Sequence, residues 1–195
     1  MAVSSRRPGI AGKLVILGKV GYSTVPCQVK EVSATDTVGL LITILVRYPE
    51  VAKINFDPEN QMLKFTFIYA QVFDESELTN LKTKLSDSIE AYNYLEGKET
   101  RFVDISYQVS ENLTLIEVQR DVDTLAQEEI TLIVEILQGS LKTNPVTEES
   151  DQLLEEDLVA QEEFIEHMLE NVKFSNHDKQ FFAFREEGRV LVFNK

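Results

Sequence analysis

The chain has 195 residues, of which 43% are hydrophobic and 27% are charged, a composition typical of a folded globular protein rather than a disordered one. Its 33 acidic and 19 basic residues give a formal net charge of −14, which disfavours binding to nucleic acid or to an anionic membrane surface. The single cysteine, Cys27, excludes an intramolecular disulfide and a metal site built from several cysteines, so we expect a cytoplasmic protein.

Residues 1–12 are rich in Ser, Pro and Gly and are predicted to form a flexible leader. The following stretch, Gly12 to Thr24, has the apolar strand and the first glycine of a nucleotide-binding loop, but Ser23 and Thr24 stand where the second glycine and the lysine belong. We therefore expect no nucleotide there. Residues 13–20 and 25–32 are rich in Val, Ile and Leu and are predicted to form two strands joined by a turn.

The next segments predict a helix followed by a hairpin. A helix is expected from about residue 33 to the residues before Pro49, and it is apolar on nearly every side, which leaves a buried strand as the alternative. Residues 51–56 and 61–70 flank the turn sequence Asp-Pro-Glu-Asn and predict a hairpin with one buried face.

The same order recurs further along the chain. Residues 74–97 predict an amphipathic helix, because leucines and other apolar residues recur at spacings of three and four. Residues 101–109 and 112–120 predict a second hairpin, and residues 123–139 predict a helix that is apolar on more than one side.

Residues 141–150 contain Asn144-Pro145 and are predicted to be a linker, which divides a core domain of residues 13–140 from an appendage of residues 151–195. The appendage is predicted to hold an acidic amphipathic helix over residues 151–172 and a final hairpin with its turn at residues 186–188.

Together these elements predict an α+β fold. Strand 25–32, the first helix, the first hairpin, the long helix and strand 101–109 follow the βαββαβ order of a ferredoxin-like core, with an antiparallel sheet and helices on one face. That fold hosts many functions, so function has to be argued from sites.

No catalytic, cofactor-binding or metal-binding residues emerge from the sequence. Glu163 and His167 share a helical face, but di-metal carboxylate bundles use a Glu-x-x-His spacing, and Phe164 stands at that position here. Nothing places Cys27 beside a histidine as a catalytic pair. We therefore expect a protein that is not an enzyme and has no cofactor.

The acidic segment is the strongest departure from average composition. Between Lys142 and Lys173 there are ten acidic residues and no basic one. A solvated helix face is the ordinary explanation, and a docking surface for a basic partner is the functional one. The candidate docking residues are Glu155, Glu156, Glu162, Glu163 and Glu166.

These observations favour a non-catalytic protein-association or assembly module, with a homodimer expected because two helices are apolar on several sides. The alternative is a regulatory module that binds a small ligand between the sheet and the helices. Expected partners are a second copy or another, possibly basic, protein, and neither nucleic acid nor membrane. The candidate self-association residues are Leu40, Leu41, Ile44, Leu45, Ile133, Ile136 and Leu137.

Overall fold

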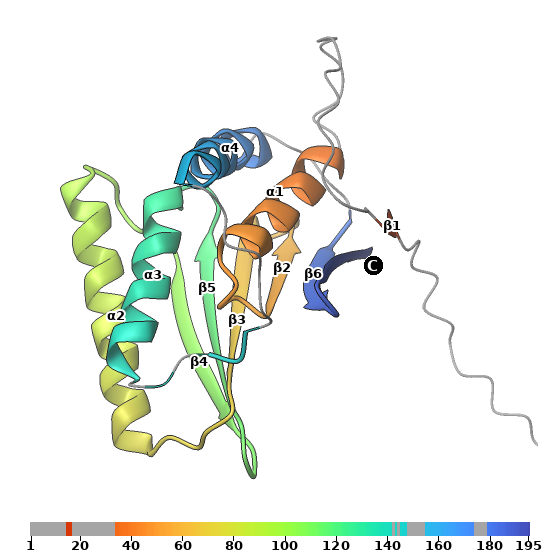
Figure 1. Ribbon diagram of the computed structural model, residues 1–195. Helices are drawn as coiled ribbons and strands as arrows, with labels where there is room; N and C mark the ends of the chain where they lie inside the picture. Colours follow the sequence, from red (N-terminus) through yellow and green to blue (C-terminus); the bar gives the residue numbers. More distant parts are fainter. Residues whose placement is uncertain (1–14, 17–33, 142, 144, 148–154, 174–178) are drawn as a thin grey trace, which may run out of the picture.

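The computed structural model describes residues 15–16, 34–141, 143, 145–147, 155–173 and 179–195. In these residues four helices pack against an antiparallel sheet, which confirms the predicted α+β class (Figure 1). The elements are β1 (Val15–Ile16), α1 (Ala34–Arg47), β2 (Lys53–Asp57), β3 (Met62–Tyr69), α2 (Glu75–Leu95), β4 (Val103–Val109), β5 (Thr114–Asp121), α3 (Gln127–Ser140), α4 (Glu155–Lys173), β6 (Phe181–Glu186) and β7 (Arg189–Asn194). The strand order is β1-β7-β6-β2-β3-β5-β4.

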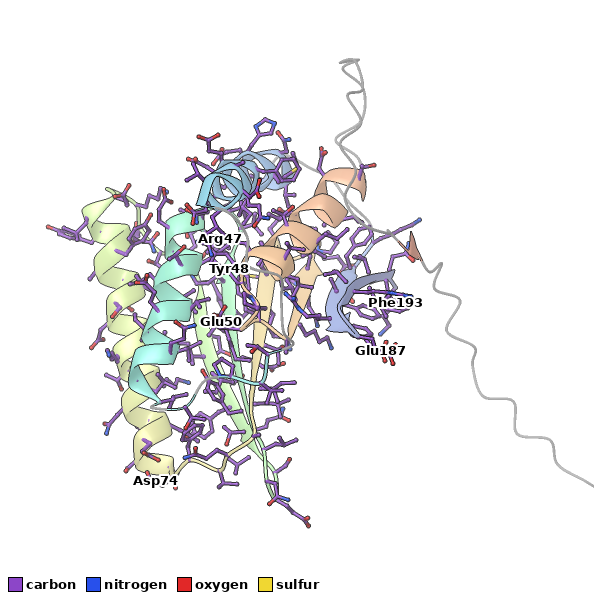
Figure 2. All side chains as sticks on the ribbon, in the orientation of Figure 1. Arg47, Tyr48, Glu50, Asp74, Glu187 and Phe193 are labelled. Carbon is purple, nitrogen blue, oxygen red and sulfur yellow. The ribbon has the colours of Figure 1, made fainter. Side chains whose placement is uncertain are left out.

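Local sequence explains where α2 begins. The Asp74 carboxylate accepts a hydrogen bond from the Glu77 backbone N–H at 2.8 Å, and the Glu77 carboxylate accepts one from the Asp74 N–H at 3.2 Å. This capping box supplies partners for backbone donors that the helix leaves unpaired. Figure 2 shows Asp74 at the lower end of the helix, away from α4.

The central strands have one buried and one open face. In β5, Ile116, Val118 and Arg120 are buried, whereas Glu117 and Gln119 between them are only partly buried. Strands β2 and β3 alternate in the same way, and their buried side chains join those of all four helices in one core. The predicted hairpin with one buried face is therefore confirmed.

The predicted helix is confirmed, because residues 34–47 form α1. The alternative prediction of a buried strand for this segment is wrong. Its apolar character on several sides is explained by its neighbours, because α1 packs against α4 on one side and against β2, β6 and β7 on the other. An element covered from two sides needs apolar residues around most of its circumference.

The C-terminal elements belong to the same sheet and core as the rest of the described chain. Strand β6 pairs with β2 over Phe181 to Phe184, and β7 pairs with β6. Ile165 and Leu169 of α4 are buried. The described part of the predicted linker is also attached, because the Val146 N–H donates to the Ile68 carbonyl at 2.7 Å. Residues 155–173 and 179–195 therefore do not form the separate appendage that we expected.

The ferredoxin-like order is not confirmed. Strand 25–32, which opens that order, lies outside the described residues, and Val15–Ile16 pairs with β7. The position between β3 and β4 is held by β5, which is antiparallel to both. The order βαββαβ would give that central position to its first strand.

Candidate functional site

The predicted self-association residues lie in the core. Leu40, Leu41, Ile44 and Leu45 have no exposed surface, Ile133 and Leu137 are 1% exposed, and Ile136 is partly buried. All of them except Ile136 therefore offer no surface to a second copy in this structure. The physical reason is that α4, expected to be detachable, covers α1, while α2, α4 and the core cover α3.

The predicted acidic docking residues differ in how exposed their side chains are. Glu162 is turned inward, and its Oε1 lies 2.5 Å from Nη2 of Arg47 on α1. Glu163 and Glu166 are exposed on α4. Glu155 and Glu156 lie in α4, but their side chains are outside the described part. Glu162 is therefore not part of an exposed docking face. Its ion pair with Arg47 instead connects α4 to α1.

Chemistry-bearing residues are not gathered into a metal or catalytic group in the described ranges. His167 is exposed on α4, and its Nε2 lies 3.4 Å from Nδ2 of Asn171. Among the described residues, no cluster of three or more His, Cys, Asp or Glu side chains has an arrangement that could hold a metal ion. Cys27, His177 and the stretch from residue 18 to residue 24 lie outside these ranges.

The most connected polar group is built around Arg120, which has no exposed surface and lies on the buried face of β5. Its Nε and Nη2 donate to the two carboxylate oxygens of Glu129 on α3, the second at 2.9 Å. Glu129 Oε2 also accepts from Asn93 Nδ2 of α2 at 2.7 Å. One buried ion pair therefore joins the sheet to two helices.

The same guanidinium also holds the beginning of β4. Arg120 Nη1 donates to the Asp121 carboxylate and, at 2.6 Å, to the Phe102 carbonyl, and Nη2 donates to Thr124 Oγ1 at 3.0 Å. Asp121 accepts in turn from the Phe102 N–H at 3.0 Å. Every guanidinium donor has a partner, which is the condition under which a buried charge is tolerated.

Burial and partners act in opposite directions on the pKa values of this cluster. Burial disfavours the charged form of Arg120, but hydrogen bonds and charge from Glu129 and Asp121 outweigh it, so the Arg120 pKa lies above its ordinary value. Burial also tends to raise the pKa of Asp121. The Thr124 hydroxyl and the charge of Arg120 outweigh that effect, so the Asp121 pKa lies below its ordinary value.

A second polar group joins α1, α3 and α4. Tyr48 Oη lies 2.7 Å from Thr131 Oγ1 and accepts from Gln127 Nε2 at 2.8 Å. Burial raises the Tyr48 pKa despite these hydrogen bonds. Figure 2 shows Arg47 and Tyr48 beneath α4 and beside α3, where their contacts link the three helices.

Two hollows adjoin these elements. One, of about 370 Å³, lies beside the second polar group, and its lining includes Tyr92, Glu128 and Glu135. Burial, and then the Glu128 carboxylate, raise the Tyr92 pKa to about 12. The other, of about 220 Å³, lies at β2, β3, β5 and β6, and it includes Asn55, whose buried Oδ1 has no hydrogen-bond partner among the described residues. Both hollows are small, and several polar side chains line each of them.

Exposed apolar side chains lie near both ends of β4. Tyr94 and Leu95 at the end of α2 are 82% and 81% exposed. Phe102, Val109 and Leu113, on or beside the β4–β5 hairpin, are between 40% and 47% exposed. These five residues, which we call the β4 patch, lie at the two ends of the strand that ends the sheet.

Neither the β4 patch nor the Arg120 cluster was predictable from local sequence pattern alone. The hairpin over residues 101–120 was predicted, but nothing in its pattern says which of its strands is at an edge. The sequence did contain a sign that Arg120 is buried. Arg120 follows Ile116 and Val118 at intervals of two residues, so in a strand its side chain lies on the same buried face as theirs.

Comparison of the chain with protein-family models, with curated proteins and with solved structures found no match. Among the described residues, no helix is long and apolar enough to cross a membrane.

Proposed function

We propose that this chain is a non-catalytic protein-association module that associates with itself. The observation that supports this function is the β4 patch, where large apolar side chains remain exposed beside the end strand of the sheet. Exposed apolar side chains beside an unpaired strand edge are typical of interaction sites. A cytoplasmic location belongs to the same proposal.

Other exposed apolar residues support the choice of surface by contrast. Val159 and Phe164 of α4 are 52% and 44% exposed, but they are flanked by the exposed carboxylates of Glu163 and Glu166. In a protein of net charge −14, two copies of that acidic face would repel each other. In β4, by contrast, Asp104 is the one charged residue.

Sedimentation velocity of the full chain, from low to high micromolar concentration, tests the proposed function. We expect the mass to rise from that of one chain to that of two. A single-chain mass across the whole range, at both low and physiological salt, would contradict self-association.

A small-ligand-binding module is the second candidate, and it is favoured by Asn55 Oδ1 beside the 220 Å³ hollow, which has no partner in the part of the chain that the structure describes. Asp57, Lys64 and Gln119 also line that hollow, so a small polar molecule is the suitable ligand class. A screen of such compounds by melting temperature, with Asn55→Ala as control, tests it. Stabilisation of the parent that Asn55→Ala abolishes would support ligand binding, and no stabilisation by any compound would count against it.

A further inference from the structure

Strand β4 is the last strand of the sheet, and it pairs only with β5 among the described residues. The hydrogen bonds at its two ends show which backbone groups this pairing uses. Ser110 and Leu113 exchange hydrogen bonds at 2.8 and 3.4 Å, and the Asp121 N–H donates to the Phe102 carbonyl. Because an antiparallel ladder alternates, the even-numbered residues of β4 bond to β5, and the odd-numbered residues direct their N–H and C=O groups outward.

We propose that β4 pairs antiparallel with β4 of a second copy, about a two-fold axis that passes beside Ser106. This inference rests on the proposed function and names the surface that performs it. In this register Ile105 faces Tyr107 of the second copy, and Val103 faces Val109 of the second copy. All four outward-facing residues then form hydrogen-bonded pairs, which gives about eight hydrogen bonds between the copies.

The side chains on the two faces agree with this register. On the helix-covered face every facing pair is apolar or aromatic, because Ile105 meets Tyr107 and Val103 meets Val109. On the open face Asp104 meets Gln108, and Ser106 meets its own copy. An axis beside Asp104 would instead place like charges opposite each other, which is destabilising, and it would leave outward groups at the far end of β4 unpaired.

A hollow beside the strand fits the same arrangement. Tyr94, Phe102 and Val103 line a space of about 500 Å³ next to the beginning of β4. In the proposed register Val109 of the second copy, 47% exposed in the single chain, lies opposite Val103 and therefore adjoins this space. Pairing would bury part of the β4 patch in both copies at once.

We propose a second copy rather than a different protein as the partner of β4 because the sequence of β4 is complementary to itself when paired antiparallel. A two-fold interface requires that one surface be complementary to itself, and the register about Ser106 is the one that pairs all four outward-facing residues of β4. The edge is also held in place, because Arg120 and Asp121 bond to the carbonyl and N–H of Phe102, immediately before β4. An ordered edge loses less entropy on pairing than a mobile one.

Disulfide trapping in the full chain tests the register, in a Cys27→Ala background that removes the native thiol. Residues facing each other in a non-hydrogen-bonded pair have Cα atoms about 4.5 Å apart, within the range of a disulfide. We therefore expect Ser106→Cys to form a covalent dimer under mild oxidation. The matched control is Asp104→Cys, on the same strand and face, whose two copies would lie about 13 Å apart.

A second pair of variants keeps the test independent of cysteine chemistry. Val109→Asp and Val159→Asp make the same charge change at valines of similar exposure, one on β4 and one on α4. We expect Val109→Asp to weaken dimerisation at least tenfold in sedimentation, and Val159→Asp to leave it unchanged within twofold, with both far-UV spectra preserved.

The outcomes separate this inference from the proposed function. A wild-type dimer that Ser106→Cys does not trap, that Asp104→Cys traps equally well, or that Val109→Asp does not weaken would overturn β4 pairing and leave self-association standing. A wild-type chain that stays monomeric would overturn both.

Discussion

Replacing Arg120 with methionine removes a guanidinium that has no exposed surface. Each of its N–H groups donates a hydrogen bond in the folded protein. Methionine fills a similar apolar volume, so the change isolates the charge and the hydrogen bonds. The carboxylates of Glu129 and Asp121 would remain buried without their cation, and the Phe102 carbonyl would lose a donor. Removing one partner of a buried ion pair costs about 3–5 kcal/mol.

Urea unfolding followed by circular dichroism measures this cost. With a urea dependence of about 2 kcal/mol per molar, the expected loss lowers the midpoint by about 1.5–2.5 M. Arg101→Ala is the control, because Arg101 also pairs with an aspartate, Asp123, but is 68% exposed. An exposed pair contributes about 0–1 kcal/mol, so its midpoint should move by less than about 0.5 M. A shift for Arg120→Met no larger than that of the control would refute the account of the cluster.

Three further predictions concern pH and backbone conformation. The Asp121 pKa is held below its ordinary value, so its stabilisation is present above the unfolded-state pKa of about 3.9 and is lost as pH falls through the folded-state value. The urea-midpoint difference between wild type and Asp121→Asn should therefore shrink between pH 7 and pH 3, and an unchanged difference would contradict it. Asp74→Ala should lower the melting temperature by about 2–4 °C through loss of the α2 cap, whereas Asp74→Asn, which can also cap, should lower it less. Gly188→Ala should cost about 1–2 kcal/mol in urea unfolding because Gly188 has a φ of 70°, and Gly139→Ala, in α3 with open space around it, should cost nothing.

Elements with strong local signals were predictable from the sequence. The hydrophobic period of α2 and its capping residues are local, so the expected helix over residues 74–97 corresponds to Glu75–Leu95. The turn between β2 and β3 is local as well, because Asp57 Oδ1 accepts from the Glu59 N–H at 3.1 Å within the turn itself.

Relations between distant segments were not predictable in the same way. The apolar circumference of α1 indicated burial on several sides, but it does not say whether α4 or a second chain supplies the cover. The pairing of β6 with β2 joins residues more than a hundred positions apart, and no local pattern encodes it. The exposed edge at β4 was not predictable for the same reason, since which strand lies at the edge is a property of the assembled sheet.

Amide hydrogen exchange of β4, measured by NMR at a monomeric and at a dimeric concentration, tests the central claim most directly. In the single chain, the N–H groups of Ser106 and Gln108 bond to β5, whereas those of Ile105, Tyr107 and Val109 face outward. We predict that the outward amides exchange rapidly at low concentration and become protected at high concentration, while the other two stay protected throughout. Rapid exchange of Ile105 and Tyr107 in a sample shown to be dimeric would contradict pairing through β4.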